Sequence, residues 1–160
     1  MRLTVDLIRA SPQFWNPLQQ REISLRGHRI PSIENLAATL DQFRVIDLTD
    51  NVIRSLDGFP TLNMLETLLL TNNKIVTISP SIGSHLPNLR TLILTNNQIS
   101  SFDTITSLQT LPKLEELSLL NNPITTLEKY REKIIELLPS LKVLDFSKIK
   151  STERMTVVRG

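Results

Sequence analysis

The sequence has no cysteine, only four glycines and two histidines, and no apolar run long enough to cross a bilayer. Without cysteine the chain can form neither disulfides nor thiolate metal sites, and this composition favours a reducing compartment. The glycines form no phosphate-binding loop, and His28 and His85 lie in no recognisable metal-binding spacing. We therefore expect no enzyme activity, no cofactor and no metal site.

The size and charge of the chain favour one globular domain. Its 160 residues, 40% of them hydrophobic, are enough for one continuous core. The formal net charge is only +2, which neither indicates nor excludes nucleic-acid binding. The first residues, up to Trp15, lack the unbroken apolar segment and cleavage site of a signal peptide. Function therefore has to be inferred from the sequence pattern rather than from bulk composition.

The string TLLLTNNKI, residues 67–75, recurs almost unchanged as TLILTNNQI at residues 91–99. Both copies fit the leucine-rich pattern L-x-x-L-x-L-x-x-N-x-L. Two further copies run from Phe43 to Ile53 and from Leu114 to Ile124, and weaker copies lie at residues 23–30 and 141–149. The period predicts an α/β fold, a leucine-rich repeat solenoid with a curved parallel sheet on its concave face. We expect about four full repeats, two degenerate terminal repeats and helical caps at both ends.

Strand geometry explains the residue types within a repeat. Side chains alternate along a strand, so Leu68 and Leu70 should point into the core while Thr67, Leu69 and Thr71 point outward. The asparagine that follows each strand offers donors and an acceptor to the backbone of the turn from inside the coil. We therefore predict a structural role for the repeated asparagines Asn51, Asn73, Asn97 and Asn122. In the first repeat, His28 takes the place of the asparagine.

Both ends of the solenoid need a cap, because a terminal repeat has only one neighbour. We expect one domain over residues 1–160, with an N-terminal cap at 1–20, repeats at 21–124 and a C-terminal cap at 125–160. In the first cap, Thr4 should begin a helix over residues 3–10. Phe14 and Trp15 are predicted to form a lid over the open end of the first repeat.

The C-terminal cap is predicted to contain a helix that begins at a threonine cap and ends at Pro139. Its apolar face would comprise Leu127, Tyr130, Ile134 and Leu138. A second helix is predicted from Thr152. This region resembles the C-terminal cap of a subset of nuclear and cytoplasmic leucine-rich proteins at Tyr130, Arg131, Pro139, Leu141, Leu144 and Asp145.

The outward strand positions would form the concave face, and most of them are polar. The apolar exceptions are Val45, Leu69 and Ile93, interpreted as corresponding positions in successive repeats, with Leu120 beside them. Scattered apolar residues are normal on protein surfaces, whereas three in register form a patch that favours partner binding. The predicted partner-binding residues are Val45, Asp47, Leu69, Thr71, Ile93, Thr95, Ser118 and Leu120.

The charges of this face favour a protein partner over RNA. The face carries Glu22, Asp47, Glu116 and Asp145 against Arg26 alone, and such a surface repels phosphate. Six strands at a spacing of about 4.8 Å would make a trough about 25 Å across, which accommodates a helix of about four turns. We therefore expect an amphipathic helix with basic flanks to bind there.

Basic residues gather elsewhere, and two interpretations of them stay open. Charges of this kind often lie on the solvated edges of a solenoid. Alternatively, Arg26, Arg29, Lys74 and Lys150 form one rim beside the concave face and contact an RNA stem once a partner is bound. No aromatic residues are interleaved with them for base stacking, so any contact should be to phosphates.

Segments that do not follow the repeat pattern carry a resemblance to a known family. IPSIENLAATLDQF at residues 30–43, IDLTDNVIRSLDGFP at 46–60, REISLRGHRI at 21–30 and LKVLDFSKIK at 141–150 are similar to the A-prime proteins of the U2 small nuclear ribonucleoprotein. This resemblance covers essentially the whole chain. The aromatic pair Phe14 and Trp15 and the absence of cysteine depart from it.

The resemblance implies a nuclear, non-catalytic scaffold of pre-mRNA splicing. It implies that the chain binds an RNA-recognition-motif partner of the B-double-prime type and helps it bind a hairpin of U2 small nuclear RNA. The alternative is another intracellular leucine-rich adaptor, such as a phosphatase regulator or an RNA-export adaptor. Such an adaptor would share the C-terminal cap but not the block from Ile30 to Pro60.

Overall fold

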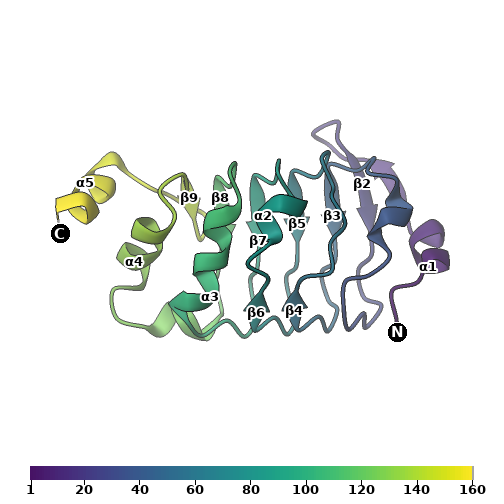
Figure 1. Cartoon of the computed structure of the whole chain (residues 1–160), viewed down its shortest axis with the longest axis horizontal. Coiled ribbons are helices and arrows are strands. Elements are labelled where there is room, and N and C mark those ends of the chain that lie inside the picture. The colour runs from purple at the N-terminus through teal and green to yellow at the C-terminus, as the bar shows by residue number, and fades with distance from the viewer. Residues whose placement is uncertain (160) are drawn as a thin grey trace.

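The computed structural model describes the backbone of residues 1–159 and the side chains of residues 1–155; Gly160, part of the predicted domain, lies outside the described residues. Its main element is an eight-stranded sheet whose central strands are parallel (Figure 1). The predicted parallel sheet of a leucine-rich repeat solenoid is therefore confirmed. Its parallel strands are β2 (Arg21–Ser24), β3 (Val45–Asp47), β5 (Thr67–Leu69), β7 (Thr91–Ile93), β8 (Glu116–Ser118) and β9 (Val143–Leu144).

Two short antiparallel strands extend the sheet at its ends, and the sequence pattern did not predict them. Strand β1 (Gln13–Trp15) pairs with β2, and β10 (Ser147–Lys148) pairs with β9. The chain therefore reverses direction at each end of the sheet. These reversals decide where the flanking side chains lie.

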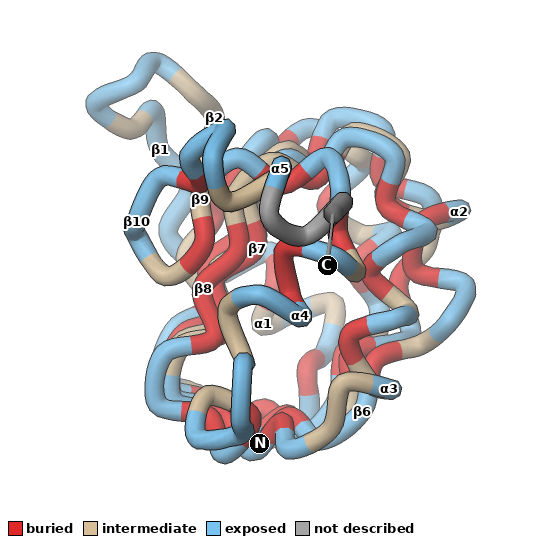
Figure 2. Tube along the Cα trace, turned by 90° about the vertical axis from the view of Figure 1, so that its left-hand side faces the viewer, coloured by how far each residue is buried: buried red, intermediate tan, exposed pale blue. Residues whose placement is uncertain are grey.

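A second layer of short elements covers the inner side of the sheet. Figure 2, which looks along the solenoid, shows the strands on one side, α2 and α3 on the other, and buried residues between them. This layer comprises the 3₁₀ turns η1 (Leu36–Thr39), η2 (Ser107–Thr110) and η3 (Pro123–Thr126), the helices α2 (Ile82–His85) and α3 (Phe102–Thr106), and a two-stranded sheet of β4 (Ser55–Leu56) and β6 (Thr77–Ile78).

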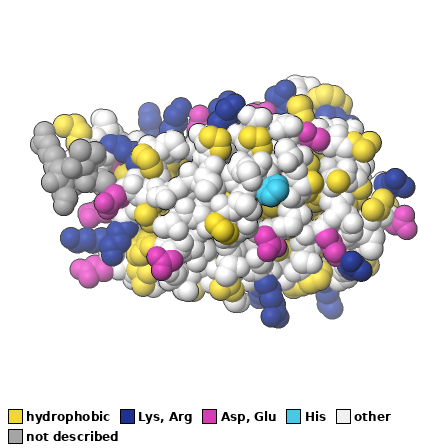
Figure 3. All heavy atoms as spheres, in the orientation of Figure 1, with side chains coloured by type: hydrophobic (Ala, Val, Ile, Leu, Met, Phe, Trp, Pro, Cys, Tyr) yellow, Lys and Arg dark blue, Asp and Glu magenta, His cyan; other side chains and the backbone are white. Residues whose placement is uncertain are grey.

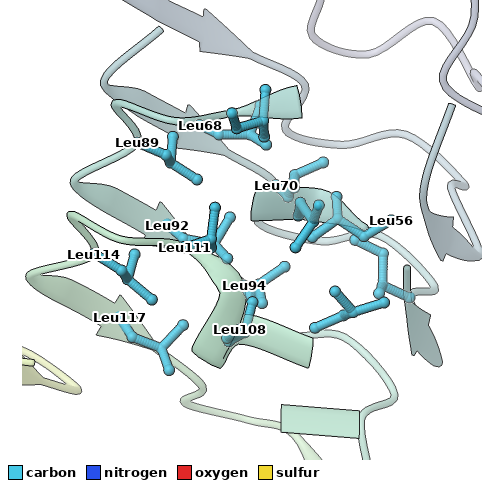
Figure 4. Packing of buried hydrophobic residues seen from close by; sticks show 14 of the residues in the cluster. Leu56, Leu68, Leu70, Leu89, Leu92, Leu94, Leu108, Leu111, Leu114 and Leu117 are labelled. Atoms are coloured by element: carbon cyan, nitrogen blue, oxygen red, sulfur yellow. The ribbon is translucent and has the colours of Figure 1, made fainter. Parts of the chain in front are cut away.

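The core between the layers is a stack of leucines and isoleucines from successive repeats. Leu68 and Leu92 occupy paired positions in neighbouring strands, and Leu70 and Leu94 follow them (Figure 4). All four are fully buried, as the strand alternation predicts. Each such side chain contributes about 1.5–3 kcal/mol by leaving water. No repeat could bury this surface without its neighbours.

The repeated asparagines bond the backbone of neighbouring repeats together, which confirms their predicted structural role. Asn97 donates from Nδ2 to the carbonyls of Leu94 and, in the preceding repeat, Leu70, both at 3.0 Å. Its Oδ1 accepts from the backbone N–H of Ile75 at 3.0 Å. The same arrangement recurs at Asn51, Asn73 and Asn122.

The residue before each of these asparagines forms a second, exposed series. Asp50, Asn72, Asn96 and Asn121 all have left-handed backbone conformation, with φ between 58° and 60°. Asn72 donates from Nδ2 to Asp50 Oδ1 at 2.8 Å, and Asn96 donates to Asn72 in the same way. Asparagine and aspartate tolerate this conformation better than most side chains. The sequence pair NN therefore specifies both the outer turn and the inner bonds.

The N-terminal cap is a helix, but its predicted aromatic lid is wrong. Helix α1 (Val5–Ala10) begins after Thr4, whose side chain accepts from the backbone N–H of Leu7 at 3.1 Å, as predicted. Leu3 and Ile8 of this region are buried in the core, so α1 itself covers the open end. Trp15 is 64% exposed because β1 pairs with the outer edge of β2 instead of crossing the core.

The main C-terminal helix is shorter than predicted. Helix α4 (Tyr130–Leu137) begins after Lys129, which makes no side-chain capping bond, so the predicted threonine cap is wrong. The hydroxyls of Thr125 and Thr126 instead bond carbonyls within η3 and its flanking residue. Leu127 precedes α4 and is 40% exposed, so it does not belong to the apolar face. Helix α5 (Ser151–Arg159) confirms the second predicted helix to within one residue.

A polar network fixes the hairpin of β9 and β10 to these helices. Tyr130 donates from its hydroxyl to Asp145 Oδ2 at 2.7 Å, and burial together with this bond raises the pKa of Tyr130 above its ordinary value. Arg131 pairs with Glu153 at 2.7 Å and lowers the pKa of that carboxyl to about 2. Arg131 also donates to the carbonyls of Leu144 and Lys148 at 3.3 Å. The turn between β9 and β10 is thereby held rigidly.

Candidate protein-binding face

The register of the parallel strands defines three rows of outward side chains. The first row contains Val45, which pairs with Thr67, and the second contains Asp47, which pairs with Leu69. The predicted alignment of Val45 with Leu69 and Ile93 is therefore wrong. The inward leucines and the asparagine fix the strand register. Leu69 lies four residues before Asn73, whereas Val45 lies six residues before Asn51, so the two do not correspond. The apolar line in the second row consists of Leu69 and Ile93, flanked by Asp47 and Ser118.

Burial separates the predicted partner-binding residues into two groups. Val45, Asp47, Ile93 and Ser118 are at most 9% exposed, because neighbouring rows of a concave surface cover one another. The partly exposed members are Leu69, Thr71 and Thr95, and Leu120 is 39% exposed. Leu120 lies in the third row, which continues the strands past their carboxyl ends. The accessible apolar surface of this face is therefore made by Leu69 and Leu120, with threonines around them.

Two of the four predicted acidic residues of this face, Asp47 and Asp145, are compensated by neighbouring groups of the chain itself. Asp47 accepts from the backbone N–H of Thr49 at 3.0 Å and lies 3.8 Å from the Arg26 guanidinium. Asp145 accepts from the backbone N–H of Leu119 and from the Tyr130 hydroxyl. Glu22 and Glu116 are the carboxylates of this face that stay half-buried without an ion pair among the described residues. A partner helix would meet a mild negative potential there.

The four basic residues of the predicted rim do not lie on one edge of the sheet. Arg29 and Lys74 occupy equivalent positions just past the carboxyl ends of the strands, and Arg26 pairs with Asp47 and Asp50 nearby. Lys150 follows β10, which runs antiparallel to β9, so it lies at the opposite edge, where the strands begin. The prediction of a single rim is therefore wrong, because the β9–β10 hairpin carries Lys150 back across the sheet.

The edge where the strands begin carries a ladder of alternating charges. Arg44, Glu66, Arg90, Glu115 and Lys142 form successive ion pairs at 3.1, 3.4, 3.2 and 3.4 Å. Each residue directly precedes the first outward position of a strand, so the sequence signal was the alternating sign at that place in the repeats. This edge is the upper one in Figure 3, which shows dark blue and magenta side chains along it.

A groove of about 790 Å³ opens beside the C-terminal end of this ladder. Its charged lining consists of several cations and a single carboxylate: Arg90, Lys113, Lys142, Lys148, Arg154 and Glu115. Arg154 donates to the carbonyls of Ile135, Leu138 and Leu141 and so helps to cap the C-terminal end of α4. Because cations outnumber carboxylates in this lining, the groove adds a positive potential to the edge.

The described residues contain neither a metal-binding cluster nor a membrane-spanning helix. Among residues 1–159, no three histidine, aspartate or glutamate side chains come together to hold a metal ion. Within the same range, no helix has the length and apolar character needed to cross a bilayer.

Comparisons with known proteins agree with this geometry. A model of the leucine-rich repeat family matches residues 1–159. The U2 small nuclear ribonucleoprotein A′ of Arabidopsis thaliana is 53% identical over 154 residues, which are 96% of this chain and 62% of that protein. The protein of the same name from Homo sapiens is 47% identical over 96% of this chain and 60% of its own length. The chain thus spans about three fifths of the length of these relatives.

A solved structure resembles the whole fold. It is described as the crystal structure of the Drosophila melanogaster SNF/U2A′ complex, and its matching chain has a TM-score of 0.98 at 46% sequence identity. The match covers 99% of this chain and 91% of that one. The resemblance therefore includes both caps as well as the repeats.

Proposed function

The chain belongs to the leucine-rich repeat family and, within it, to the A′ proteins of the U2 small nuclear ribonucleoprotein, and we propose that it is a nuclear, non-catalytic scaffold of pre-mRNA splicing. It binds an RNA-recognition-motif protein of the B-double-prime type on its concave face. The observation that carries this proposal is the exposure of Leu69 and Leu120 on an otherwise polar, rigid sheet. The relative solved as a complex with SNF supports it.

The partner is a protein helix rather than RNA at this face. Leu69 and Leu120 can contact apolar side chains, whereas Glu22 and Glu116 disfavour phosphate and favour basic residues beside the helix. The hydrogen-bonded asparagines hold the face in one shape before binding. Little conformational freedom is then lost when the partner binds.

We propose further that the chain helps its partner to bind a hairpin of U2 small nuclear RNA through phosphate contacts. The candidate contacts now divide into two edges, with Arg26, Arg29 and Lys74 on one and Lys150 on the other. The second edge is favoured because the groove cations Lys142 and Lys148 also lie there. Bound partner would hold these cations near the RNA at high effective concentration.

Gel shifts of the hairpin over a salt series test this proposal. The chain alone should bind little hairpin at physiological salt, the chain and an RNA-recognition-motif protein should form a pair without RNA, and the three together should bind most tightly. Lys148→Glu with Lys150→Glu should weaken the ternary complex and lower its salt slope by about one unit for each phosphate that is no longer neutralised. Arg29→Glu with Lys74→Glu is the matched control with the same change of charge.

Each outcome of this experiment has a definite meaning. If the control pair has the larger effect, the RNA lies at the opposite edge. If neither pair changes the ternary complex, the chain makes no phosphate contact. Failure of the two proteins to pair would contradict the scaffold function itself.

A further inference from the structure

Phe146 is a large apolar residue held in an unfavourable backbone conformation at the surface. It is 61% exposed, and its φ is 62°, in the left-handed region. Asp145 before it has φ 53°, and Leu144 pairs with Ser147 across the turn. Two left-handed residues at the centre of a two-residue hairpin are usually asparagine and glycine. A phenylalanine here is disfavoured by the left-handed backbone and leaves most of its apolar surface in water.

The hydrogen bonds that fix this turn come from Asp145 and from the backbone, and a phenyl ring can contribute none of them. Asp145 accepts from the Leu119 N–H at 2.6 Å and from the Tyr130 hydroxyl at 2.7 Å. Arg131 donates to the carbonyl of Leu144 on the inner side of the turn. The core is closed by Leu144, which is fully buried. Smaller polar residues would keep these hydrogen bonds and suit the left-handed backbone better, so the hydrogen bonding of the turn does not require an aromatic ring.

The turn lies beside the exposed apolar part of the concave face. The hydrogen bond between Leu119 and Asp145 joins the carboxyl end of β8 to the turn, and Leu120 and Phe146 are the next residues on its two sides. Leu120 is 39% exposed. Leu120 and Phe146 therefore lie together at the C-terminal end of the same concave face that carries Leu69 on β5. Strained residues that the fold does not require are found most often at binding sites.

We propose that Phe146 anchors the partner protein at the C-terminal end of the concave face, where it inserts with Leu120 into an apolar site at one end of the partner's helix. This inference rests on the proposed function, because its occupant is the same RNA-recognition-motif protein. The occupant follows from continuity with the face that includes Leu69. A rigidly presented aromatic side chain is the kind of residue that dominates binding energy at protein interfaces.

Phe146→Asn separates the binding role from the folding role. Asparagine suits the left-handed turn, so the thermal midpoint should be unchanged or higher than in the wild type. Affinity for the RNA-recognition-motif protein, measured by calorimetric titration, should fall at least about tenfold. Phe146→Gly also fits the turn and should show the same loss of affinity. This second variant keeps the test valid if asparagine itself disturbs the hairpin.

Leu40→Asn provides a matched control. Leu40 is 79% exposed and has φ 58°, but it follows η1 in the layer opposite the sheet. It should gain the same conformational relief and keep wild-type affinity. Unchanged affinity in both Phe146 variants, or an equal loss in Leu40→Asn, would overturn the role of Phe146 while leaving the proposed function intact. A wild-type chain that does not bind the partner would instead refute the proposed function.

Discussion

The double variant Leu69→Asp with Leu120→Asp should lose at least about 100-fold in affinity for an RNA-recognition-motif partner. Both side chains point away from the core, and each aspartate would have to leave water in the complex without a paired cation. The free energy of unfolding should change by less than about 1 kcal/mol, since neither position contributes to the leucine stack. Calorimetric titration and a thermal melt of the same sample measure the two effects.

Val52→Asp with Val76→Asp is the control for this prediction. Both valines are exposed, at 36% and 44%, and both lie past the asparagine turn, away from the concave face. The change of net charge is the same, so a general electrostatic effect would appear in both variants. Equal loss of affinity in the two would show that charge, rather than the concave surface, determines binding.

Asn97→Ala should lower the free energy of unfolding by about 1–3 kcal/mol. The substitution leaves the buried N–H of Ile75 without a partner. It also removes one of two asparagine donors from each of the carbonyls of Leu70 and Leu94, which keep their bonds to Asn73 and Asn122. Each unpaired buried group costs about 1–3 kcal/mol. Urea denaturation followed by circular dichroism measures the change.

The neighbouring residue offers a matched comparison. Asn96→Gly removes the same side-chain amide from the exposed series, and glycine accepts its left-handed conformation. Its effect should stay below about 1 kcal/mol, as for most surface substitutions. If Asn97→Ala were as mild as Asn96→Gly, the inner asparagines would not hold the repeats together.

The core and the inner bonds could be predicted from the sequence because they repeat. The inward positions of Leu68 and Leu70 and the role of Asn97 follow from the period together with strand alternation. The misplacement of Val45 shows the limit of this approach. Alignment by apolar character put it beside Leu69, whereas counting back from the asparagines gives the observed pairing with Thr67.

The errors outside the repeats have a common physical origin. The hairpin at Asp145 and Phe146 lacks the asparagine–glycine signal of such turns, so no local pattern indicated that Lys150 lies on the other edge. The predicted lid of Phe14 and Trp15 does not form, because pairing of β1 with β2 leaves Trp15 exposed. A terminal segment packs against one repeat instead of two, so its conformation is less strongly determined by the repeat pattern.

The most direct test of the concave face uses the absence of cysteine from the chain. Two single variants, Leu120→Cys on the concave face and Val76→Cys past the asparagine turn, introduce one thiol each at positions of similar exposure. The measurement is the rate of thiol labelling with and without excess RNA-recognition-motif protein. We expect the partner to slow labelling of Leu120→Cys at least about tenfold and to leave Val76→Cys unchanged. Labelling of Leu120→Cys at the same rate in the complex, or protection of Val76→Cys alone, would contradict binding at the concave face.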